Sequence, residues 1–71
     1  MSKWKDAVAI YNEALTVNPN YVKAYYKRAM AQFEQMNYEE SMTDIKKAYG
    51  LDPNNSDIRD GYEKIRVKYN D

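Results

Sequence analysis

Residues 14–20 read Ala-Leu-Thr-Val-Asn-Pro-Asn, and residues 48–54 read Ala-Tyr-Gly-Leu-Asp-Pro-Asn. The two segments share an alanine and a Pro-Asn pair at a spacing of 34 residues. The same shift aligns residues of similar size or polarity upstream: Trp4 with Tyr38, Asp6 with Glu40, Ala7 with Ser41, Tyr11 with Ile45, and Val17 with Leu51. Similarity at a fixed period of this length is typical of repeat architectures. We infer that the chain contains the same packing unit more than once.

Four helices are predicted, because apolar residues recur at steps of three and four between sparse prolines and glycines. The predicted helices cover about Lys3–Val17, Tyr21–Gln35, Tyr38–Tyr49 and 56–70. Pro19 ends the first helix, since proline disfavours the helical conformation of the residue before it. We expect Gly50 to end the third helix at positive φ, and Ser56 to cap the N-terminus of the fourth.

At these positions the chain resembles the tetratricopeptide repeat, whose unit of 34 residues is a pair of helices, A and B. The residues that match the pattern of this family are Tyr25, Ala29, Tyr38, Ile45, Ala48 and Pro53. The resemblance implies an all-α fold of antiparallel helix hairpins in one module over residues 1–71. Residues 3–17 would be helix B of a partial repeat, residues 21–53 a full repeat, and residues 56–70 a capping helix. The chain departs from the pattern at Met36, where the family has a glycine, and at Gln32, where a tyrosine is expected.

The partial repeat begins without a helix A. Repeats of this kind bury their faces only against neighbours, so we expect Trp4, Val8 and Tyr11 to remain partly exposed. Three explanations stay open: a fragment of a longer array, an engineered minimal unit, or a subunit of a homo-oligomer. The last explanation makes these three residues a candidate self-association surface and gives the chain a structural, self-assembling role.

A pair of lysines suggests a different role. Lys23 and Lys27 are four residues apart, so they share one face of the second helix and repel each other. A carboxylate placed between two ammonium groups would gain charge-assisted hydrogen bonds from both. Lysines at this spacing also commonly do no more than solvate a helix face, and that interpretation stays open.

The stretch Lys23-Ala24-Tyr25-Tyr26-Lys27-Arg28-Ala29 is similar to the last repeat of the carboxylate-clamp subgroup of the family, which includes co-chaperones and immunophilins. The resemblance implies binding of an extended acidic peptide, such as the C-terminal tail of heat-shock protein 70 or 90. Lys23 and Lys27 would hold its carboxylates, while Tyr26, Met30 and Phe33 would contact its apolar side chains. A complete clamp in this family also uses residues from two preceding A helices, which this chain lacks.

Composition argues against most other functions. The chain has no cysteine and no histidine, and it carries 11 basic and 11 acidic residues. Disulfides are therefore impossible, the commonest metal ligand is missing, and no net charge attracts nucleic acid. No histidine can activate a serine or threonine hydroxyl, and no apolar run approaches the roughly 20 residues that span a bilayer. We predict a cytoplasmic, non-enzymatic protein-binding module that uses no cofactor or metal and contacts neither nucleic acid nor membrane.

Overall fold

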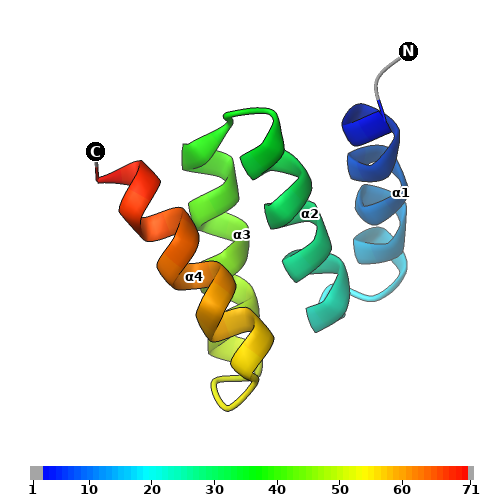
Figure 1. Ribbon diagram of the computed structural model, residues 1–71. Coiled ribbons are helices and arrows are strands. Elements are labelled where there is room, and N and C mark those ends of the chain that lie inside the picture. The colour runs from blue at the N-terminus through cyan, green and yellow to red at the C-terminus, as the bar shows by residue number, and fades with distance from the viewer. Residues whose placement is uncertain (1–2, 71) are drawn as a thin grey trace.

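The computed structural model describes residues 3–70, which form four helices and no strand. The helices are α1 (Lys3–Val17), α2 (Val22–Glu34), α3 (Tyr38–Leu51) and α4 (Ser56–Tyr69). Each helix packs against the next, and α4 crosses in front of α3 and also reaches α2 (Figure 1). The predicted all-α class and its helix hairpins are confirmed. The predicted module limits at residues 1 and 71 lie outside the described residues.

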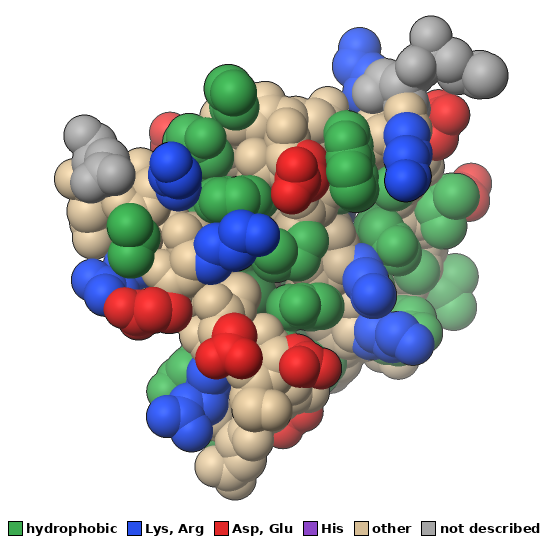
Figure 2. Space-filling model, viewed as in Figure 1, with side chains coloured by type: hydrophobic (Ala, Val, Ile, Leu, Met, Phe, Trp, Pro, Cys, Tyr) green, Lys and Arg blue, Asp and Glu red, His purple; other side chains and the backbone are tan. Residues whose placement is uncertain are grey.

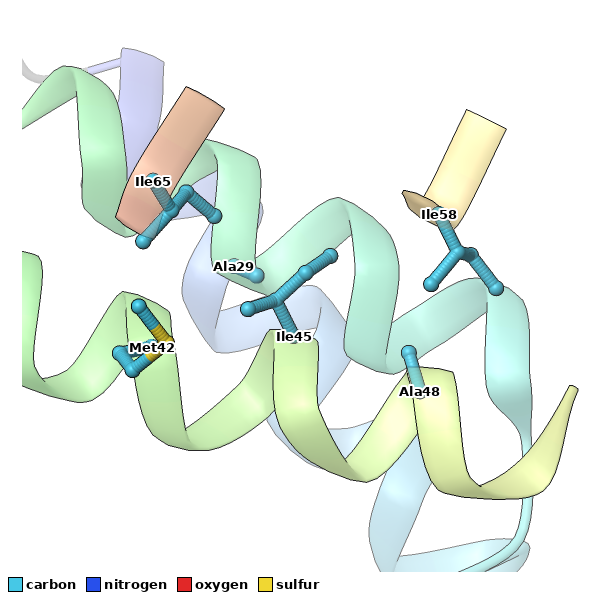
Figure 3. Packing of buried hydrophobic residues seen from close by; sticks show 6 residues of the cluster. All are labelled: Ala29, Met42, Ile45, Ala48, Ile58 and Ile65. Carbon is cyan, nitrogen blue, oxygen red and sulfur yellow. The ribbon is translucent and has the colours of Figure 1, made fainter. Parts of the chain in front are cut away.

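The core lies where α2, α3 and α4 meet. Its buried side chains are Ala29 from α2, Met42, Ile45 and Ala48 from α3, and Ile58 and Ile65 from α4. Figure 3 shows the two isoleucines of α4 pointing toward the row of α3 side chains. Full burial of one large aliphatic side chain contributes about 1.5–3 kcal/mol, so these contacts fix α4 on the α2–α3 hairpin.

Polar contacts join the helices around this core. The hydroxyl of Ser41, which is fully buried, donates to the carbonyl oxygen of Ala29 at 2.7 Å. The guanidinium of Arg28 donates to both carboxylate oxygens of Asp44 at 2.6 Å and to Oδ1 of Asn12 at 2.8 Å. The hydrogen bond to Asp44 raises the pKa of Arg28. Arg28 is therefore committed to a network that links α1, α2 and α3.

The turn between α2 and α3 is a Schellman motif. The N–H of Asn37 donates to the carbonyl of Gln32 at 2.9 Å, and the N–H of Met36 donates to the carbonyl of Phe33 at 3.0 Å. This motif requires a left-handed residue just after the helix, and Met36 takes that conformation with φ 64°. Met36 occupies the position where the repeat pattern has glycine. The left-handed conformation is therefore adopted by a residue with a Cβ atom, at a cost in free energy.

Several predicted helix ends are wrong. The third helix continues through Gly50 to Leu51, and Gly50 does not have a positive φ. This helix stops at Asp52, because Pro53 disfavours the helical conformation there. The second helix is one residue shorter at each end than predicted, since Tyr21 and Gln35 are its caps.

The cap of the fourth helix was also wrongly predicted. Asn55, not Ser56, caps α4: its side-chain oxygen accepts hydrogen bonds from the N–H groups of Asp57 and Ile58 at 3.0 and 3.3 Å. Ser56 is the first helical residue.

Candidate peptide-binding site

The five predicted peptide contacts lie on α2 but differ in burial. Lys23 and Lys27 are exposed, whereas Tyr26, Met30 and Phe33 are half-buried and pack against the core. The reason is the close approach of α4 at Gly61. A Cβ atom added there would lie 3.1 Å from Cε1 of Tyr26 and 3.5 Å from Sδ of Met30. The side chains of Tyr26 and Met30 therefore pack between α2 and α4, and only part of each is accessible to a partner.

One pocket, of about 350 Å³, lies between the N-terminal parts of α2 and α4. The residues on the α2 side are Val22, Lys23, Tyr26 and Lys27, and those on the other side are Asp52, Asn55, Asp57 and Ile58. Two carboxylates thus line the same pocket as the two ammonium groups. In Figure 2, acidic side chains lie over the lower part of α4, while basic side chains are spread over the whole visible face. This α4-side pocket has no excess of positive charge.

A second pocket, of about 100 Å³, lies between α1 and α2 and is lined by Tyr11, Tyr21, Lys23, Ala24 and Lys27. None of the described residues that line it is acidic. The lysine pair therefore borders two pockets of different electrostatic character, one on either side. The Nζ atom of Lys27 lies 5.9 Å from the ring centroid of Tyr26, which lines the α4-side pocket.

The helix ends add to this asymmetry. The cap residue of α2, Tyr21, offers no side-chain hydrogen bond, and the first turn of α2 holds no acidic residue. By contrast, α4 has the Asn55 cap, and Asp57 lies in its first turn. Because a helix N-terminus carries a partial positive charge, α2 reinforces the field of the lysines, while Asp57 offsets that of α4.

The candidate self-association residues lie on α1. Trp4 is 37% exposed, and Val8 and Tyr11 are half-buried. The 34-residue shift also places Ile10 at the position of Asp44, which α2 covers. Asp44 is 5% exposed, whereas Ile10 is 62% exposed. No described helix covers α1 on the side that corresponds to the α2-facing side of α3.

Two further features bear on function. Among residues 3–70, no group of three or more acidic, histidine or cysteine side chains is placed to hold a metal ion. Within the same residues, no helix is long and apolar enough to cross a membrane.

Comparison with known proteins identifies the family. Residues 1–36 match the family described as TPR repeat, and residues 22–55 match the tetratricopeptide repeat. The chain belongs to the tetratricopeptide-repeat family, whose repeats serve protein–protein interaction. No solved structure gives a significant match.

Two curated relatives are similar to the chain. A DnaJ homolog subfamily C member 7 homolog from Dictyostelium discoideum is 33% identical over 97% of this chain and 13% of its own length. A serine/threonine-protein phosphatase T from Aspergillus oryzae is 38% identical over 75% of this chain and 11% of its own length. The chain thus spans about an eighth or less of these relatives.

Proposed function

We propose that the chain is a protein-binding scaffold that holds an extended acidic segment through Lys23 and Lys27. The observation that carries this proposal is the placement of the two lysines: both are exposed, and neither forms a salt bridge with any residue in the range 3–70. A carboxylate beside them would relieve their mutual repulsion and gain charge-assisted hydrogen bonds. Arg28 adds no third contact, because Asp44 and Asn12 occupy it.

The DnaJ name of one relative supports an association with chaperones. We therefore take the acidic C-terminal tail of heat-shock protein 70 or 90 as the first partner to test, in the cytoplasm. The apolar contacts would come from the open part of Phe33, which lines a depression of about 520 Å³ at the other end of α2 together with Asp60, Glu63, Lys64, Val67 and Lys68. The exposed parts of Tyr26 and Met30 lie between. No catalytic role is proposed.

The test is calorimetric titration of the tail peptide into the chain and into two double variants. Lys23→Ala with Lys27→Ala should weaken binding by about tenfold or more, since hydrogen bonds to charged groups are worth about 1.5–3 kcal/mol each. Lys46→Ala with Lys47→Ala is the matched control: it removes the same charge from exposed positions on α3 that line neither pocket. Equal weakening of binding in both variants would mean that affinity depends on net charge alone, and would reject the lysine pair as the binding site.

A second candidate function is self-assembly through α1, and the exposure of Ile10 and Trp4 favours it. A second copy would bury these apolar side chains, with Val8 and Tyr11 at the edge of the contact. Sedimentation equilibrium should then detect species above the monomer mass of 8.4 kDa. Trp4→Ser or Ile10→Ser should restore the monomer, whereas Val67→Ser on α4 should not. A monomer at every concentration would reject this function.

A further inference from the structure

We infer that the carboxylate of the bound peptide lies on the α1 side of the lysine pair, in the pocket of Tyr11, Tyr21, Lys23 and Lys27. The two tyrosines then become direct contacts of the ligand. This inference rests on the proposed function, because it requires that the lysine pair binds an anion. It adds two binding residues and decides between the two pockets that the lysines border.

Charge separates the two pockets. On the α4 side, Asp52 and Asp57 line the same space as the lysines, and their carboxylates would repel an incoming carboxylate. Asp52 is held there by the hydrogen bond that it accepts from the side-chain amide of Asn55 at 3.2 Å. On the α1 side none of the lining residues within 3–70 is acidic, so an anion meets the same two ammonium groups without that repulsion.

The α1-side pocket also supplies neutral donors. A tyrosine hydroxyl can donate one hydrogen bond to a carboxylate. The hydroxyl of Tyr25 is already engaged with the carbonyl oxygen of Pro19 at 2.8 Å. The hydroxyls of Tyr11 and Tyr21, by contrast, form no hydrogen bond with any other residue that the structure describes, so both are free for a ligand. Tyr21 is exposed and Tyr11 is half-buried.

The size of the pocket suits a carboxylate. Its volume of about 100 Å³ is roughly three times the 30 Å³ that one water molecule occupies in the liquid. This space is large enough for a carboxylate group. The exposed cation–π contact between Lys27 and Tyr26 does not compete with the ligand, because a charge-assisted hydrogen bond is stronger.

The experiment removes the hydroxyls and keeps the rings. We expect Tyr11→Phe and Tyr21→Phe each to weaken binding of the acidic tail peptide about tenfold or more, the usual effect of losing one hydrogen bond to a charged group. Tyr69→Phe, an exposed tyrosine on α4 that lines neither pocket, is the control and should leave affinity unchanged. Asp57→Asn tests the opposite side and should change affinity less than about twofold.

Two results would overturn the inference. If the lysine variants abolish binding, both tyrosine variants bind normally and Asp57→Asn binds at least about fivefold more tightly, the peptide lies on the α4 side. The proposed function then survives and the inference fails. If the lysine variants bind as well as the unchanged chain, the proposed function and the inference fail together. Circular dichroism of each variant shows that the helices are intact.

Discussion

Met36 holds a backbone conformation that its side chain does not favour. Its φ of 64° costs a residue with a Cβ atom about 1–2 kcal/mol, while glycine adopts it freely but loses about 0.5–1 kcal/mol more chain entropy on folding. The side chain is 74% exposed, so its removal sacrifices little burial. We predict that Met36→Gly raises the free energy of unfolding by about 0.5–1 kcal/mol and the melting temperature by about 2–8 °C. Met36→Ala keeps the Cβ atom and should give no gain in the same thermal melts; equal stability of the two variants would contradict this account.

The ion pair of Arg28 and Asp44 should affect stability mainly through the unpaired charge that remains when one partner is removed. Asp44→Ala leaves a partly buried guanidinium without its carboxylate, and we expect a loss of about 2–3 kcal/mol in urea denaturation. Arg28→Met with Asp44→Ile replaces both charges by apolar side chains, as Ile10 does at the equivalent position of α1. This double variant should be more stable than the single one. A double variant as unstable as Asp44→Ala would mean that the ion pair itself, rather than the unpaired charge, carries the stability.

Within the helices, the two glycines of the chain distinguish the effect of helix propensity on stability from the effect of packing. A Cβ atom at Gly50 meets nothing within 4 Å, so Gly50→Ala should stabilise α3 by about 0.5–1 kcal/mol. The same change at Gly61 places a Cβ atom 3.1 Å from the ring of Tyr26, and the strain should cancel that gain. Chemical denaturation of both variants checks the difference. A Gly50→Ala variant that is less stable than the unchanged chain would instead support the expectation that Gly50 ends the helix at positive φ.

The helices could be predicted from the sequence because each depends mainly on its own periodicity and on the prolines that follow it. The predicted ends failed where a tertiary or local geometric detail decides. Glycine is common at helix ends, so Gly50 was expected to end α3. Pro53 instead ends this helix at Leu51, two residues after the predicted last residue. Both Asn55 and Ser56 are good cap residues, and only the backbone of the Asp52–Asn55 turn decides which one is the cap.

Only those features of the candidate site that lie on a single helix could be predicted from the sequence. The spacing of Lys23 and Lys27 is a property of α2 and could be read from the sequence. Their surroundings depend on how three helices pack, because Asp57 comes from α4 and Tyr11 from α1. The family resemblance likewise implied that Tyr26 and Met30 contact the peptide, but it could not show that α4 packs closely against them at Gly61.

The unequal cover of the helices should appear in the stability of the whole molecule. In stacked repeats, stability comes from the interfaces between neighbours. Among the described helices, α3 has two such interfaces, with α2 and α4, whereas α1 packs against α2 alone. We predict that native-state hydrogen exchange is at least about tenfold faster for the amides of α1 than for those of α3, equivalent to about 1.4 kcal/mol of local stability. Protection of α1 that rises with protein concentration would show that a second copy covers Ile10 and Trp4. Equal protection of all four helices at low concentration would mean that the chain unfolds as one unit despite the open face of α1.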